Sequence, residues 1–229
     1  MWKGEGTDQG LYFSSFDGQS WAPQERVPGN TGPDAPVNMG LGLQYQETTE
    51  WCWLAIAASV AHFYDPASSV TQTSLMTQIG HAINGWPLTI DCYPDASVLA
   101  AHPGLAATIA NPYASSAEYA LDGVGIPVIC IKSRGVGDAL NVSGNNASYH
   151  STATLSELAV EVLANRPVCV DISWIGGGGS HVVAIAGVLN DQILVLDPAQ
   201  GETVIDFEDF PAHYSAGATL DGYTFTKVH

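Results

Sequence analysis

Apolar positions in the first part of the main body follow helical patterns. Residues 49–64 are rich in alanine and apolar on most sides, and the run ends at Asp65-Pro66. This pattern predicts a buried helix with Thr48 or Thr49 as its N-cap. A second, more amphipathic helix is expected over about residues 71–83. Residues 84–150 are broken repeatedly by glycine, proline, serine and asparagine, and only short helices near 97–101 and 116–122 are expected there.

The pattern changes towards strands after residue 150. Thr154-Leu-Ser-Glu157 reads as a capping box that opens an amphipathic helix ending near Asn165. Apolar runs typical of strands follow, and a turn at Asn190-Asp191 joins the second to the third. The expected strands cover residues 167–172, 181–187, 192–197, 203–205 and 223–227. Helices followed by a hairpin-rich sheet favour an α+β fold with an antiparallel sheet.

Residues 1–38 differ from the rest and predict a β-hairpin extension followed by a linker. The hairpin would turn at Asp17-Gly18, and the stretch from Val27 to Pro36 contains three prolines and two glycines. Ser15 to Trp21 resembles a degenerate Asp-box of sialidase-type propellers, but one copy cannot build a propeller. We therefore expect two parts, the extension 1–38 and a main domain 39–229.

Charge and composition narrow the classes of partner. Six Lys+Arg stand against 23 Asp+Glu, a formal net charge of −17. Such a chain repels phosphate backbones and anionic lipid surfaces, so we expect no nucleic-acid or membrane partner. No run reaches the roughly 18–20 apolar residues of a membrane span, and the N-terminus lacks a signal-peptide pattern. Secretion and a cytoplasmic location both stay open, and we expect a monomer.

The four cysteines form no CxxC pair, and the histidines lack metal-ligand spacing. We therefore expect no metal and no other cofactor, and disulfides among Cys92, Cys130 and Cys169 stay open. Cys52 is the candidate nucleophile, because a helix start favours the thiolate. A thiolate that attacks a carbonyl also needs a proton carrier and donors for the developing oxyanion. Gln46, six residues upstream, could place its side-chain amide beside the Cys52 backbone N–H.

His181 is the candidate proton carrier, and Asp197 closes the next expected strand, where it could orient the imidazole. A strict two-residue hairpin would pair position 181 with 200 and turn Asp197 to the other face of the sheet. A triad therefore predicts a three-residue loop or a β-bulge between these strands. Taken singly, each residue has a structural explanation: a small buried hydrophobe, a strand-start histidine and a turn former before proline.

The residues around Cys52 and His181 together resemble a known family. Gln46-Glu-Thr-Thr-Glu-Trp-Cys52-Trp53 and Trp174-Ile-Gly-Gly-Gly-Gly-Ser-His181, with Asp197-Pro198 after them, are similar to the papain-like cysteine peptidases. The compact bacterial AvrRpt2-like group is the nearest match, and the second block is also similar to the double-glycine leader peptidases. The resemblance implies a papain-like two-lobe fold, with an N-terminal helical lobe and a C-terminal antiparallel β-sheet lobe.

The resemblance also implies roles for individual residues. Cys52 would be the nucleophile, His181 the general acid/base, Asp197 the orienting residue and Gln46 an oxyanion donor. No tryptophan follows Asp197 closely, so Trp174 is the candidate aromatic shield over the His–Asp pair. Substrate contacts are assigned to a further set: Trp53, Trp174, Gly178, Gly179 and Ser180.

The function expected from this reading is a cysteine peptidase that hydrolyses peptide bonds through a thioester. Two alternatives stay open. One is an acyl transferase or deamidase, transglutaminase-like, using the same triad. The other is an inactive papain-like binding module, for which the Asp-box-like hairpin would predict glycan binding and an unreactive Cys52. The expected partner is a peptide or protein substrate, and a separate activator or inhibitor stays open.

Overall fold

The computed structural model describes residues 2–3, 11–13, 25–26, 35–84 and 134–228. The helices expected near 97–101 and 116–122, the turn at Asp17-Gly18, the Asp-box-like stretch, Cys92 and Cys130 lie outside these residues. In the N-terminal part, β1 (Trp2–Lys3), β2 (Leu11–Phe13) and β3 (Glu25–Arg26) form a small antiparallel sheet. The pairing of β2 with β3 agrees with the expected hairpin, and β1 was not predicted.

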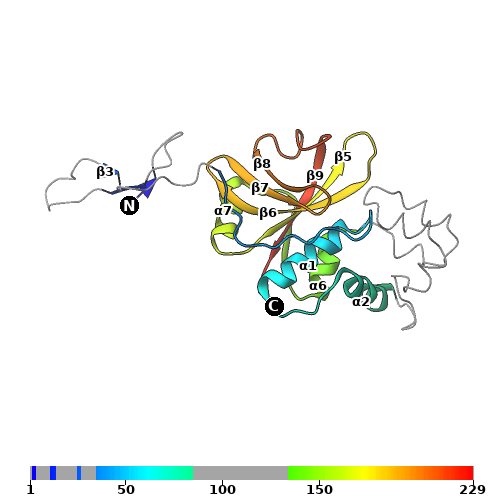
Figure 1. The fold of residues 1–229 in the computed structure, drawn as a ribbon. Helices are drawn as coiled ribbons and strands as arrows, with labels where there is room; N and C mark the ends of the chain where they lie inside the picture. Colours follow the sequence, from blue (N-terminus) through cyan, green and yellow to red (C-terminus); the bar gives the residue numbers. More distant parts are fainter. Residues whose placement is uncertain (1, 4–10, 14–24, 27–34, 85–133, 229) are drawn as a thin grey trace.

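The main body contains four described helices and a six-stranded sheet (Figure 1). The helices are α1 (Cys52–Tyr64), α2 (Gln72–Asn84), α6 (Val136–Val142) and α7 (Leu155–Leu163). The strands are β4 (Asn146–His150), β5 (Val168–Trp174), β6 (Ser180–Leu189), β7 (Gln192–Asp197), β8 (Gly201–Asp206) and β9 (Ala218–Thr226). Their order in the sheet is β4-β9-β5-β6-β7-β8, and all neighbours are antiparallel, which confirms the predicted α+β class.

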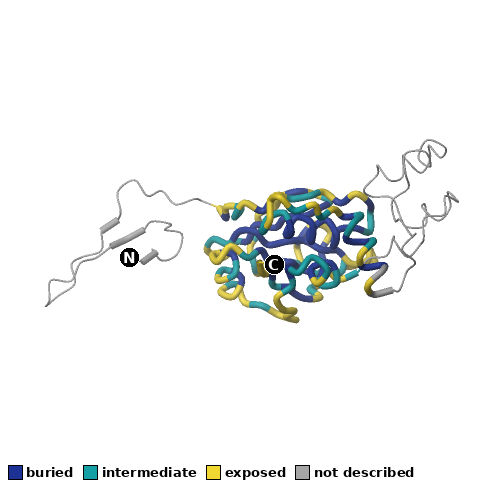
Figure 2. Tube along the Cα trace, turned by 90° about the horizontal axis from the view of Figure 1, so that it is seen from below, coloured by how far each residue is buried: buried dark blue, intermediate teal, exposed yellow. Residues whose placement is uncertain are grey.

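Two hydrophobic cores cover the two faces of this sheet. Helices α1, α2 and α6 bury one face, where Cys169 and Val182 contact the helical core. Helix α7 and the segment after β8 cover the other face, where Val170, Val183 and Val195 are buried. Figure 2 shows the buried segments running through the middle of the body. The central strands are therefore buried on both faces, which is why they read as almost continuous apolar runs.

Helix α1 is the most buried helix of the described body. Every residue from Cys52 to Ala61 is buried, and the small side chains of its alanines let neighbouring elements approach closely. The N-cap prediction was wrong, because Trp51 occupies that position without a side-chain cap bond. The chain makes one further turn first, with the Trp51 N–H donating to the Thr48 carbonyl at 3.2 Å, so Thr48 and Thr49 precede the cap.

Other elements match the sequence pattern closely. The capping box at Thr154 and Glu157 is formed, and β7 spans the expected residues 192–197. Helix α6 and strand β4 were not predicted, since both lie in the stretch broken by glycine and asparagine. No helix among the described residues is long and apolar enough to cross a membrane.

Candidate active site

The pairing of β6 with β7 decides whether His181 and Asp197 can meet. The hairpin begins with Leu189 opposite Gln192, and Gly187 lies opposite Leu194. The register then shifts, so that Ala184 pairs with Leu196 and Ala186 is the extra residue of a β-bulge. Asp197 therefore falls opposite Val183 and on the same face as His181. The predicted bulge is confirmed, and its effect is to bring the two polar side chains together.

His181 and Asp197 form a buried hydrogen-bonded pair. The imidazole Nε2 lies 2.8 Å from Asp197 Oδ1, which leaves Nδ1 free to face another group. Oδ1 also accepts the backbone N–H groups of Ala199 (2.7 Å) and Gln200 (3.2 Å). The hydroxyl of Tyr214 donates to the other oxygen, Oδ2, at 2.8 Å. Four donors thus hold a carboxylate that is fully buried, which is what a buried charge requires.

These contacts shift the pKa of both partners away from ordinary values. Burial opposes protonation of His181, but the Asp197 hydrogen bond, together with the hydrogen bond and charge of Cys52, raises its pKa to about 10. Burial likewise favours the neutral form of Asp197, yet the His181 hydrogen bond and charge and the donors from Ala199 and Tyr214 lower its pKa. The pair is therefore an imidazolium and a carboxylate at neutral pH.

Cys52 reaches this pair from the helical side. It is the first residue of α1 and is buried, and its side chain lies within hydrogen-bonding reach of His181. The first N–H groups of a helix lack intrahelical partners, and the helix dipole is positive at this end. Both features favour negative charge at this end of the helix, beside the His181 imidazolium. Cys52, His181 and Asp197 are thus brought together by elements far apart in the sequence.

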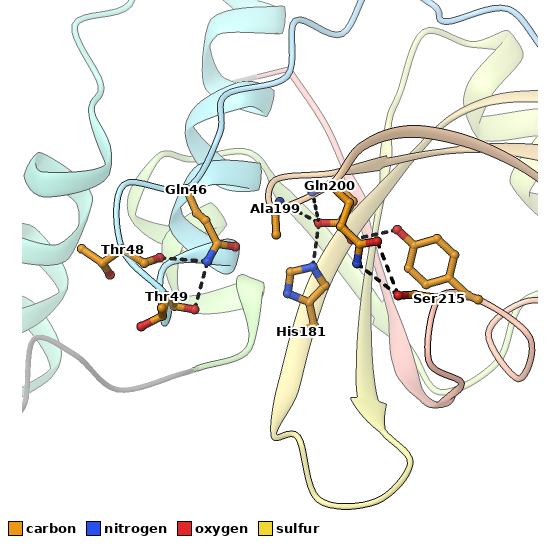
Figure 3. Close-up of polar contacts among 9 residues, drawn as sticks. Gln46, Thr48, Thr49, His181, Ala199, Gln200 and Ser215 are labelled. Atoms are coloured by element: carbon orange, nitrogen blue, oxygen red, sulfur yellow. Dashed lines mark hydrogen bonds and ion pairs between the residues drawn. The ribbon is translucent and has the colours of Figure 1, made fainter. Parts of the chain in front are cut away.

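Gln46 lies in the segment that leads into α1, and its amide is turned towards its own loop. Both N–H groups of Nε2 donate to backbone carbonyls, those of Thr48 at 2.9 Å and Thr49 at 3.0 Å. The carbonyl oxygen Oε1 is buried and has no hydrogen-bond partner (Figure 3). In this arrangement Gln46 offers no proton to the cleft, so oxyanion donation would require its amide to turn. The role stays a prediction.

Two aromatic residues enclose the His–Asp pair. The ring of Trp174 stacks on the imidazole of His181, with centroids 5.5 Å apart and an interplanar angle of 26°. This is the place expected for the aromatic shield. Trp174 also stacks on Tyr214, at 6.2 Å and 14°. Tyr214 was missed by the sequence analysis, since nothing in the local pattern between β8 and β9 indicates a contact with Asp197.

The glycine-rich loop between β5 and β6 lies next to these rings and is exposed. Gly176, Gly177 and Gly179 have positive φ angles, which only glycine adopts without strain. Gly178 is required for another reason, because a Cβ there would lie 3.0 Å from Cβ of Trp174. Gly178, Gly179 and Ser180 are accessible to a substrate, and their contact with one stays a prediction.

Replacing Gly178 with alanine is expected to displace Trp174 from His181 and lower kcat/KM for a peptide substrate about 10-fold, because small misplacements in a reacting site cost much of its rate. Gly42→Ala is the matched control, since a Cβ there meets no atom within 4 Å and the φ of Gly42 is ordinary. Equal rates for both variants would show that the position of Trp174 does not matter for turnover.

Trp53 does not belong to the substrate surface. Its side chain is fully buried in the helical core, and its indole N–H donates to the Glu50 carbonyl at 3.0 Å. The assignment of Trp53 as a substrate contact is therefore wrong. The physical reason is that α1 is buried on all sides here, so the residue next to Cys52 points into the core.

Within the described residues, no group of three or more His, Cys, Asp or Glu side chains could hold a metal ion. Cys169, the other described cysteine, is fully buried, and desolvation raises the pKa of its thiol far above the usual range. Its neighbour Asp171 adds to that shift. Of the two described thiols, only Cys52 has the electrostatic surroundings of a nucleophile.

Comparison with known proteins gives one decisive match. The model of the Peptidase C39-like family matches residues 40–219, which is most of the chain. The chain belongs to the Peptidase C39-like family. The predicted papain-like cysteine peptidase family is thereby confirmed, and membership indicates a cysteine peptidase. Placement in the AvrRpt2-like group stays a prediction.

A solved structure is also similar to this C39-like chain. The crystal structure of a candidate C39-like peptidase from Bacillus anthracis is similar with a TM-score of 0.48 and 12% sequence identity. The match covers 85% of this chain and 98% of that chain. Comparison with curated proteins gives no match.

Proposed function

We propose that this protein is a cysteine peptidase that hydrolyses peptide bonds, and that residues 39–229 form its catalytic domain. One observation carries the proposal. A cysteine at the start of a buried helix lies within reach of a histidine that is hydrogen-bonded to a buried, fully satisfied aspartate. That combination supports covalent catalysis by a thiolate better than a structural role, because a merely structural cysteine needs no charged partner.

The mechanism follows from the charges. The Cys52 thiolate attacks the scissile carbonyl, and its sulfur forms a bond to the carbonyl carbon. The His181 imidazolium then gives its Nδ1 proton to the leaving amine as the C–N bond breaks, which produces a thioester. Neutral His181 next takes a proton from water, the resulting hydroxide attacks the thioester, and the thiolate leaves. Asp197 keeps Nε2 of the imidazole occupied throughout, so that Nδ1 faces the reacting atoms.

The developing oxyanion needs hydrogen-bond donors near Cys52. The backbone N–H of Cys52 is available at the helix start, and the side-chain amide of Gln46 becomes a second donor once it turns from the loop carbonyls. Peptide and protein chains are the proposed substrates. The exposed glycine loop and Ser180, directly before His181, form one wall that such a chain would contact.

The test combines labelling with product analysis. A limiting thiol-directed epoxide at mildly acidic pH should modify Cys52 alone, since ordinary thiols are protonated and slow there. Cys169 is the internal control. Peptide mixtures incubated with the protein should yield new C-termini, and Cys52→Ala should abolish them. Mass spectrometry separates hydrolysis from deamidation and acyl transfer. Uniform low reactivity of all four cysteines, with no cleavage, would contradict the proposal and favour an inactive binding module.

A further inference from the structure

Residues 44–47 carry Gln46 to the active site without belonging to any strand. Several of their backbone groups are nevertheless paired. The Gln44 N–H donates to Ser59 Oγ of helix α1 at 2.8 Å, and the Gln46 N–H donates to the Pro198 carbonyl at 3.0 Å. The second bond ties the segment to the residue that follows Asp197. The backbone around Gln46 is thus held by contacts from outside the segment.

Two further backbone groups are held by one side chain, that of Gln72. Its Nε2 donates to the Tyr45 carbonyl at 2.8 Å, and its Oε1 accepts the Glu47 N–H at 3.0 Å. One amide therefore hydrogen-bonds to the peptide groups on both sides of Gln46, as a neighbouring strand would. Gln72 is almost completely buried, which makes each of these bonds hard to replace with water.

The helix that carries Gln72 is itself well fixed. Gln72 is the first residue of α2, and Thr71 and Ser74 cap this helix reciprocally, with N–H to Oγ distances of 2.8 and 3.0 Å. Leu75 and Met76 anchor α2 in the helical core with no exposed surface. The amide of Gln72 is thus presented from a rigid element, which is the requirement for a group that sets the geometry of a site.

We propose that Gln72 is a positioning residue for the oxyanion hole. It fixes the backbone on both sides of Gln46 relative to Cys52 and leaves the Gln46 side chain free to turn its amide towards the substrate. The inference rests on the proposed peptidase function. Gln72 should therefore affect the attack on the substrate carbonyl, which needs an oxyanion donor. It should not affect formation of the thiolate, which depends on Cys52 and His181.

The test separates these two steps. Gln72→Met keeps the length of the side chain and removes both hydrogen bonds. Gln72→Glu keeps the acceptor for Glu47 but places a buried carboxylate oxygen against the Tyr45 carbonyl. We expect kcat/KM for peptide hydrolysis to fall about 10- to 100-fold in Gln72→Met, somewhat below the effect of losing a donor itself, and at least as far in Gln72→Glu. The rate and pH profile of Cys52 alkylation should be unchanged in Gln72→Met.

A double-mutant cycle with Gln46→Ala then shows through which residue Gln72 acts. If Gln72 works through Gln46, its substitution should cause little further loss once Gln46 is alanine. Gln192→Met is the matched control, because the Gln192 amide contacts Asp206 at the far end of β7. Thermal unfolding of every variant monitors folding.

The outcomes distinguish the two claims. Hydrolysis unaffected by Gln72→Met, equal losses in hydrolysis and alkylation, or additive losses with Gln46→Ala would each overturn the positioning role while the peptidase stands. A wild-type protein that neither reacts at Cys52 nor cleaves peptides would overturn the proposed function and the positioning role with it.

Discussion

Replacing His181 with alanine is expected to lower kcat/KM for peptide hydrolysis by about 10²- to 10⁴-fold, the range that one acid–base residue contributes. The imidazolium both stabilises the Cys52 thiolate and protonates the leaving amine, so its loss affects two steps. Alkylation of Cys52 by a limiting epoxide at mildly acidic pH should fall as well, because the cysteine becomes an ordinary thiol. Peptide mass spectrometry of the adduct measures the second effect directly.

His213→Ala is the matched control for this experiment. His213 also forms a pair with an aspartate, Asp209, at 2.9 Å, but that pair is exposed and lies between β8 and β9. Its removal should leave hydrolysis and alkylation unchanged. If His181→Ala retains the alkylation rate of the wild-type protein, the Cys52–His181 pair is not an ion pair and the proposed mechanism is wrong.

Replacing Asp197 with asparagine is expected to move the alkaline limit of peptide hydrolysis to lower pH. Asparagine can keep the hydrogen bonds, with Oδ1 accepting from His181 and the backbone and Nδ2 donating to the Tyr214 hydroxyl, so the change removes mainly the charge. Loss of a neighbouring opposite charge changes a pKa by about 1–3 units. The pKa of His181, about 10 in the native site, should fall accordingly.

The shift is towards lower pH because the protonated form of His181 is the active one. The His181 imidazolium must protonate the leaving amine, so hydrolysis is lost as the pH rises through the pKa of His181, and a lower pKa ends hydrolysis at a lower pH. A pH series of kcat/KM for peptide hydrolysis from pH 6 upward measures the midpoint. Tyr214→Phe is the control, because it removes a donor from Asp197 but keeps the charge, and should not lower this midpoint. An unchanged midpoint in Asp197→Asn would contradict the role assigned to the carboxylate.

The meeting of His181 with Asp197 could be predicted because strands impose a simple geometry. Alternation within the runs 181–187 and 192–197 fixes which side chains share a face, so the sequence alone required a three-residue loop or a bulge for His181 to meet Asp197. The structure contains that bulge at Ala186. Likewise, the Ala-rich run after Thr49 was sufficient to place Cys52 near a helix start, because few other arrangements bury so many apolar residues.

Other parts of the site could not be predicted from local sequence patterns. Tyr214 reaches Asp197 only because the chain folds back after β8, a contact that depends on tertiary packing. Trp53 was misassigned because its position next to Cys52 in the sequence does not show which side of the helix its side chain occupies. Helix α6 has only seven residues, and β4 is largely exposed, so neither carries an apolar period long enough to be recognised.

The bulge at Ala186 has a consequence for how related sequences should be aligned. Side chains alternate along a strand, so the residue counts from His181 to the turn and from the turn to Asp197 have a parity that the proposed site must preserve. Relatives can lengthen or shorten either strand by two residues and keep both groups on one face. A relative with one residue more or fewer in a strand must have lost this bulge or gained another, whereas a residue added to the turn leaves the register of both strands unchanged. A single-residue gap between the two motifs should therefore be placed at the bulge or in the turn, because elsewhere it would move one of the two side chains to the other face of the sheet.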